Sequence, residues 1–281
     1  MEMKKVLTIA GSDSGGCAGI QADLKTMGAL GVFGMSVITA VTSQNTLGVT
    51  YIEELSVKSV TTQMEAVYDD LYPDAVKTGM LFSKDIIEAV YNVLSKRNKS
   101  PYVLDPVMVA TSGAKLLKDD AINYMIEKLF PIADLVTPNI PEAELISGIS
   151  IKSQTDVDKA CKIIKEKGAK NVIIKGGHFN NDESVDTLYD GINHYEIAST
   201  RIVTNNTHGT GCTYSSAISS YLALGYNMLD AVKYAKQYIT SAIIYGAELK
   251  LGKGSGPVNH FYESIRNNND GTISFGSCSC G

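Results

Sequence analysis

The sequence predicts an α/β protein in which a central, mostly parallel sheet carries helices on both faces and ends in a small antiparallel edge. Short apolar runs of strand length alternate along the chain with segments of helical period, as in proteins whose parallel sheet is covered on both sides. Near residues 184–204 this pattern gives way to short alternating strands. The chain has 281 residues, of which 44% are hydrophobic and 20% charged, so it has enough apolar residues for a sizeable core.

The expected elements follow from these patterns in chain order. Buried strands are expected at residues 6–9, 36–41, 75–77, 102–104, 135–136 and 172–174. Helical spacing, such as that of Ile20, Leu24 and Met27, predicts helices at residues 19–30, 59–71, 84–96, 119–128, 141–147 and 156–167. Residues 185–189 and 194–197 read as a hairpin around Asp190 and Gly191, and long helices follow at residues 211–224 and 228–249.

No composition shift, repeat or linker divides the chain, which predicts one domain over residues 1–266 and a loosely held polar tail over residues 267–281. Lys and Arg number 25 against 30 Asp and Glu, and the net charge of −5 argues against nucleic acid as a partner. The longest apolar runs fall far short of the roughly 20 residues that span a bilayer, so no membrane partner is expected. Five cysteines, an odd number, without a secretory leader predict a cytoplasmic protein with reduced thiols.

Candidate site residues follow the predicted strands, where ligands bind in sheets of this kind. Gly209, Thr210, Gly211 and Cys212 open a predicted helix, and a Gly-rich turn there offers backbone N–H groups and the positive end of the helix dipole to an anion. The dipole is also expected to lower the pKa of Cys212, so that its thiolate accepts a hydroxyl proton. The alternatives are an ordinary turn and a small buried thiol.

Other candidates are polar groups at neighbouring strand ends. Asp105, Asn139 and Glu142 offer the oxygen ligands that Mg²⁺ takes alongside nucleotide phosphates, although helix capping explains them equally well. Lys175 follows a β-branched strand and precedes two glycines, which suits a phosphate oxygen. Gln44 and Asp23 are candidates for hydrogen bonds to a heteroaromatic ring. The sequence lacks both G-x-x-x-x-G-K-[ST] and G-x-G-x-x-G, so a nucleotide site must be of another type.

Taken together, these motifs resemble the hydroxymethylpyrimidine/phosphomethylpyrimidine kinases of thiamine biosynthesis, in the ribokinase-like superfamily. The resemblance covers residues 5–262 and rests on motifs at residues 8–26, 37–41, 44–46, 77–80, 105–109, 137–143, 175–178, 206–212 and 256–261. It implies a ribokinase-like fold and two successive phosphorylations of the pyrimidine by ATP with Mg²⁺. The expected partners are therefore small molecules, and we also expect a homodimer.

The resemblance further implies a role for each candidate residue. The pyrimidine pocket would be formed by Gln44, Asp23, Gly11 and Met80. ATP would be bound by Lys175, Asn139 and Glu142, and Mg²⁺ by Asp105 and Glu142. The anion hole would consist of Gly209, Thr210, Gly211 and Cys212, with Cys212 as the base.

Two positions bear on the packing of the first Gly-rich loop and on the choice of substrate. Cys17 stands where the family usually has a small residue in its first Gly-rich loop. Ala110 stands where the related cysteine-type pyridoxal kinases usually carry a second cysteine, which favours the pyrimidine and leaves pyridoxal open. A non-catalytic ligand-binding sensor is the third reading, and the intact anion loop, Lys175 and candidate metal residues argue against it.

Overall fold

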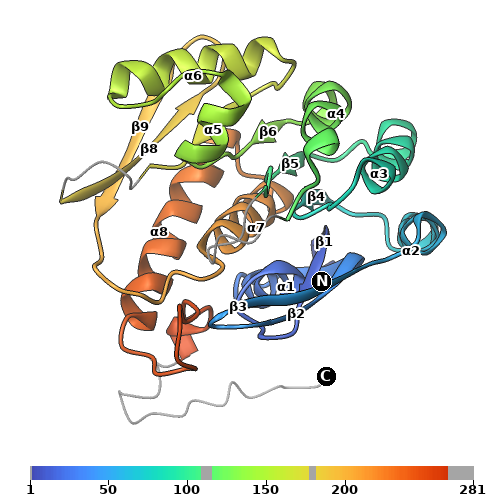
Figure 1. The fold of residues 1–281 in the computed structure, drawn as a ribbon, viewed down its shortest axis with the longest axis horizontal. Coiled ribbons are helices and arrows are strands. Elements are labelled where there is room, and N and C mark those ends of the chain that lie inside the picture. The colour runs from blue at the N-terminus through green and yellow to red at the C-terminus, as the bar shows by residue number, and fades with distance from the viewer. Residues whose placement is uncertain (1, 109–115, 177–181, 265–281) are drawn as a thin grey trace.

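The computed structural model describes residues 2–108, 116–176 and 182–264, and its centre is a nine-stranded sheet in the order β3-β2-β1-β4-β5-β6-β7-β8-β9 (Figure 1). The strands are β1 Lys5–Asp13, β2 Phe33–Asn45, β3 Gly48–Glu54, β4 Ala75–Thr78, β5 Tyr102–Leu104, β6 Leu135–Val136, β7 Val172–Ile174, β8 Glu183–Tyr189 and β9 His194–Thr200. The run from β2 to β7 is parallel. The predicted tail at residues 267–281 lies outside the described residues.

Helices cover both faces of the sheet, because successive residues of each buried strand point to opposite sides. Leu7, Ile9 and Val172 pack in a core with α2–α6, whereas Val103 and Ile173 pack with α7 and α8 on the other face. The helices are α1 Gly19–Ala29, α2 Val57–Asp70, α3 Lys84–Arg97, α4 Asp119–Leu129, α5 Ile140–Ser147, α6 Gln154–Glu166, α7 Thr210–Ala223 and α8 Met228–Gly246, with a 3₁₀ turn at Phe130–Ile132. The α/β prediction is confirmed.

The antiparallel part of the sheet is larger than predicted. The hairpin of β8 and β9 joins β7 at one edge, as expected. At the other edge β2 runs on to Asn45 and pairs with β3, an antiparallel strand that the sequence analysis omits. The polar residues of this strand, which lies at the edge of the sheet, gave no buried apolar run to detect. Both edges of the sheet are therefore antiparallel.

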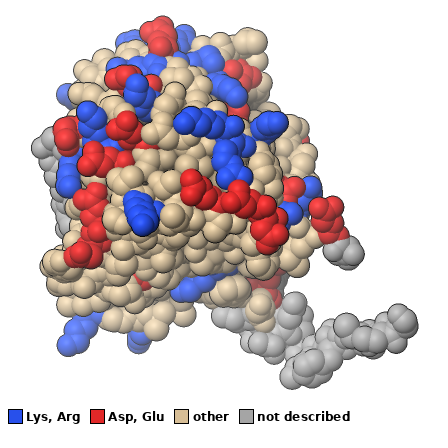
Figure 2. All heavy atoms as spheres, turned by 90° about the vertical axis from the view of Figure 1, so that its right-hand side faces the viewer, with Lys and Arg blue, Asp and Glu red and all other residues tan. Residues whose placement is uncertain are grey.

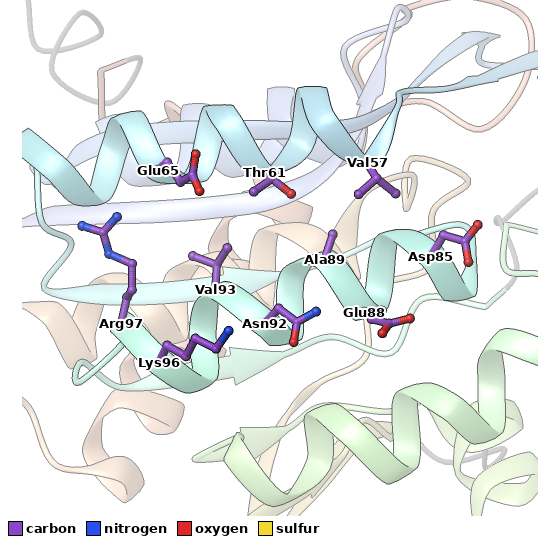
Figure 3. Close-up of a pocket in the computed structure, with 10 residues that line it drawn as sticks. All are labelled: Val57, Thr61, Glu65, Asp85, Glu88, Ala89, Asn92, Val93, Lys96 and Arg97. Atoms are coloured by element: carbon purple, nitrogen blue, oxygen red, sulfur yellow. The ribbon is translucent and has the colours of Figure 1, made fainter.

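On the side of the molecule seen in Figure 2, acidic and basic side chains are interspersed. Within the described ranges no helix combines the length and the apolar character needed to cross a bilayer. A hollow of about 490 Å³ lies between α2 and α3 (Figure 3), and its lining contains none of the candidate residues from the sequence.

Candidate active site

A larger cavity, of about 770 Å³, lies beyond the carboxyl ends of the parallel strands. The chain runs outward from β1 to β2 and then returns to β4 on the other side of β1, and ligands bind at such a switch point. The volume is in the range of sites for small ligands. The candidate residues that line the cavity are Gly11, Gln44, Met80, Asp105, Asn139, Glu142, Lys175, Gly209, Thr210, Gly211 and Cys212.

The first turn of α7 faces this cavity. Gly209 precedes the helix with φ of 83°, in the left-handed region, and supplies no side-chain cap. The Thr210 N–H donates to the Thr207 carbonyl at 3.3 Å, which leaves the N–H groups of Gly211 and Cys212 for a ligand. A Cβ on Gly209 would lie 1.9 Å from the carbonyl oxygen of Cys17, so only glycine fits there. A Cβ on Gly211 would lie 3.3 Å from Nζ of Lys175, which places that ammonium beside the turn. The arrangement is suited to an anion.

Half-buried Lys175 and buried Asp105 form an ion pair next to this turn, with Nζ and Oδ1 2.9 Å apart. Asp105 also accepts hydrogen bonds from the hydroxyls of Thr137 and Ser215, at 3.1 Å each. Burial opposes ionisation of Asp105, but the ammonium groups of Lys175 and Lys77 outweigh it and hold the pKa of the carboxyl below its usual value. A lysine that is already paired in this way can turn to a phosphate without leaving the cavity.

Asn139 and Glu142 form a capping box at the start of α5. The Asn139 side chain accepts from the Glu142 N–H and the Glu142 carboxylate accepts from the Asn139 N–H, both at 2.9 Å. The capping role that the sequence analysis left open is therefore confirmed. Burial raises the pKa of Glu142 to about 7, although Lys175 opposes the shift. Within the part of the chain that the structure describes, its other oxygen has only a long 3.4 Å contact from the Met108 N–H, which leaves acceptor capacity toward the cavity.

Cys212 is half-buried on the first turn of α7. Burial raises the pKa of its thiol to about 11, and the positive charge of Lys77 only partly opposes this rise. The prediction that this pKa is lowered is wrong. Removing the thiolate from water destabilises it by more than the helix end and Lys77 stabilise it. The group is a thiol at neutral pH in the free protein.

Asp23 does not line the cavity, in contrast to the expectation for it. Its side chain is fully buried and accepts from Nζ of Lys77 at 2.9 Å with both oxygens. The hydroxyls of Thr8 and Ser216 also donate to it, at 2.6 and 2.7 Å. Sequence reasoning assigned no role to Lys77, although a lysine within the buried strand β4 was a visible signal of an internal ion pair.

Gln44 lies at the other end of the cavity, which we call the Gln44 end and define by Gly11, Gln44 and Met80. Its amide nitrogen lies 2.8 Å from Nε2 of His208, and its carbonyl accepts from the Thr42 hydroxyl at 3.0 Å. A Cβ on Gly11 would lie 3.1 Å from the sulfur of Met80, so the absence of a side chain there keeps the pocket open. His208, which is not among the candidate residues from the sequence, contacts the predicted ring-binding residue.

Comparison with known proteins identifies the family of this chain. The model of the phosphomethylpyrimidine kinase family matches residues 13–259. The chain belongs to this family. It is thus a kinase, and its fold is the ribokinase-like one that the sequence predicted.

Individual relatives agree. A hydroxymethylpyrimidine/phosphomethylpyrimidine kinase of Haemophilus influenzae is 49% identical over 92% of this chain and 97% of its own. The thiamine biosynthesis bifunctional protein ThiED of Geobacter sulfurreducens is 50% identical over 91% of this chain, which spans only 52% of that longer protein. Among solved structures, phosphomethylpyrimidine kinase of Clostridium difficile 630 is 48% identical with a TM-score of 0.77 over 85% of this chain and 99% of its own. Pyridoxal kinase of Staphylococcus aureus with AMP-PCP and pyridoxal is 38% identical, with a TM-score of 0.85 over 94% of this chain and 96% of its own.

Proposed function

We propose that the protein transfers the γ-phosphoryl group of ATP to the hydroxyl of 4-amino-5-hydroxymethyl-2-methylpyrimidine, and then a second one to the resulting monophosphate, for thiamine biosynthesis. One observation carries the proposal: the first turn of α7, Lys175 and Gln44 all line a single cavity. A helix start that suits an anion, a lysine that suits phosphates and an amide that suits a pyrimidine ring in one cavity support phosphoryl transfer to a substituent of the ring. The family membership supports the same assignment.

In the proposed reaction Gln44 hydrogen-bonds the ring and turns the hydroxymethyl group toward the first turn of α7. The backbone N–H groups of Gly211 and Cys212 stabilise negative charge as it develops on the transferred group, which is where positioned donors lower the barrier most. Lys175 neutralises phosphate oxygens. Cys212 takes the hydroxyl proton in this scheme, which requires the small thiolate fraction that its raised pKa allows at neutral pH.

The residues present also fit a magnesium ion. Glu142 and Asp105 offer carboxylate oxygens at one wall of the cavity, and Mg²⁺ in kinases is typically held by one or two carboxylates together with phosphate oxygens. Glu142 is the freer of the two, because Asp105 is already paired with Lys175. When bound, the ion would neutralise charge on the nucleotide phosphates.

Pyridoxal is the second candidate substrate, since the S. aureus relative that holds it shares this fold over 94% of the chain. A single assay separates the readings: ATP consumption with hydroxymethylpyrimidine, its monophosphate and pyridoxal offered in parallel. We expect turnover with the first two to exceed that with pyridoxal. A preference for pyridoxal would reverse the substrate assignment, and no ATP turnover with any of the three would favour the non-catalytic sensor. The cytoplasmic location and the homodimer belong to this proposal.

A further inference from the structure

Asp13, Cys17 and His208 meet beside the Gln44 end of the cavity, and the proposed reaction uses none of them as a catalytic group. All three side chains are buried, and one ligand atom from each lies within 4.8 Å of the other two. A thiolate, a carboxylate and an imidazole are the donors from which zinc sites are built.

The spacing is close to that of a metal site. A tetrahedral zinc ion with bonds of about 2.0–2.3 Å holds its ligand atoms about 3.3–3.8 Å apart, so the three ligand atoms need to approach one another by about 1.5 Å at most. Side-chain rotation on this scale requires no change in the fold. The three residues come from the end of β1, from the loop that follows it and from the loop before α7, so they are held by separate parts of the chain.

Asp13 keeps a free coordination position, and His208 can offer the lone pair that now faces the Gln44 amide. The Asp13 carboxylate accepts the N–H groups of Gly15, Cys17 and Ala18 at 2.8, 2.9 and 2.8 Å, which uses three of about four acceptor positions and orients the group. The His208 ring hydrogen-bonds the Ser255 backbone, the kind of outer contact that orients metal-binding histidines. Burial lowers the pKa of His208, so the ring is neutral and can donate a lone pair.

The charges also balance. Burial, together with the nearby Asp13, raises the pKa of the Cys17 thiol, which is protonated without a cation. Binding of a divalent ion would form the sulfur–metal bond and release the thiol proton to solvent. The thiolate and the carboxylate then offset both charges of the ion.

We propose that Asp13, Cys17 and His208 bind one divalent cation of the zinc class, and that this binding competes with the pyrimidine. His208 Nε2 now faces the amide of Gln44 at 2.8 Å, so an ion that takes this lone pair removes the partner that orients Gln44. The cation site stands on its own geometry, whereas the competition rests on the proposed function.

The test begins with cation binding alone. The full chain with Cys278 and Cys280 replaced by serine, which removes the thiols of the C-terminal segment, is titrated with Zn²⁺ against a colorimetric chelator. It is also titrated with Co²⁺, whose thiolate charge-transfer absorption reports a sulfur ligand. We expect one equivalent to bind. Cys17→Ala should weaken binding by at least about 100-fold, since loss of a direct ligand costs no less than loss of an outer partner.

Cys161→Ala is the matched control, because Cys161 is equally buried but belongs to α6. It should bind Zn²⁺ as the parent does. The site is refuted if the parent takes up no ion, if Cys17→Ala binds as tightly as the parent, or if only Cys212→Ala abolishes the cobalt signal.

The competition is read separately by calorimetric titration of hydroxymethylpyrimidine with and without Zn²⁺. In the parent its apparent Kd should rise in proportion to free Zn²⁺, and in Cys17→Ala it should not change. An unchanged Kd in a parent that has bound Zn²⁺ would disprove the competition. Failure of the pyrimidine to bind either protein without Zn²⁺ would count against the proposed function, while the cation titration still decides the site.

Discussion

Single side chains of this site owe their behaviour to burial more than to their neighbours in sequence. Cys212 begins a helix, yet burial raises the pKa of its thiol to about 11. Glu142 sits near a lysine, yet burial raises the pKa of its carboxyl to about 7. Both residues were candidates from sequence, but their protonation depends on how much water the fold removes around them.

Cys212 can be tested through the pH dependence of the reaction. If its thiolate is the base, kcat/KM should rise with pH through the alkaline range toward the pKa of about 11, because only the deprotonated form accepts the proton. Cys212→Ala should lower kcat by about 100-fold or more and remove this rise. Pre-steady-state or steady-state pH–rate profiles of both proteins measure it. An alkaline rise that persists in the variant would assign the proton to another group.

The proposed role of Gln44 can be tested by comparing the KM values of the enzyme for the pyrimidine and for ATP. Gln44→Leu keeps the side-chain volume but removes the hydrogen bonds, so a buried ring edge is left without its partner. We expect KM for the pyrimidine to rise by about 10-fold or more and KM for ATP to change little, as judged from initial rates with each substrate varied. Equal increases in both constants would contradict the assignment.

At the scale of elements, the site is made by strand ends and helix starts rather than by the helices and strands themselves. The capping box of Asn139 and Glu142 starts α5, and Gly209 starts α7. A helix start can therefore serve stability and ligand binding with the same residue, and matched variants are needed to separate the two.

The matched control position for Gly209 is Gly225, which lies just after the other end of α7. Both have positive φ, 83° and 94°, so alanine costs about 1–2 kcal/mol of backbone strain at either position. Only at Gly209 would the new Cβ meet another atom, 1.9 Å from the Cys17 carbonyl, whereas at Gly225 it meets nothing within 4 Å. Gly209→Ala should therefore lower kcat by at least about 100-fold, which is about what the loss of an oxyanion donor costs. Gly225→Ala should leave kcat unchanged. Comparable kcat in the two variants would argue against the anion hole.

A ligand role of Asn139 can be distinguished from its capping role by comparison with Ser153, whose side chain also accepts a backbone N–H at the start of its helix, α6. Asn139→Ala and Ser153→Ala should each lower the free energy of unfolding by about 1 kcal/mol, as measured by urea denaturation. Only Asn139→Ala should also raise KM for ATP. If neither variant changes KM, Asn139 is a cap and not a ligand residue.

At the scale of the whole molecule, one buried ion pair joins the layers beneath the cavity. Lys77 in β4 pairs with Asp23 in α1, and Asp23 also accepts from Ser216 in α7. This network therefore links β4 of the sheet to two helices, α1 and α7, which also pack against each other.

Lys77→Met should lower the free energy of unfolding by about 3–5 kcal/mol, because it leaves a buried carboxylate without its counter-charge. The matched control is Lys4→Met, which breaks the exposed pair with Asp74 and should have no measurable effect. Chemical denaturation of both variants measures the difference. A loss at Lys77 as small as that at Lys4 would show that the pair does not support the fold.

The sequence by itself determined the fold class, most of the elements and the family, because buried parallel strands and glycine-rich loops leave local patterns that need no tertiary information. Every candidate site residue that it named lines the cavity, except Asp23. Only the tertiary structure decided that Asp23 forms an ion pair with Lys77, that Cys212 is a protonated thiol, and that Asp13, Cys17 and His208 lie close together. Burial, ion pairing and proximity between residues distant in sequence depend on how the layers pack, and no local pattern encodes them.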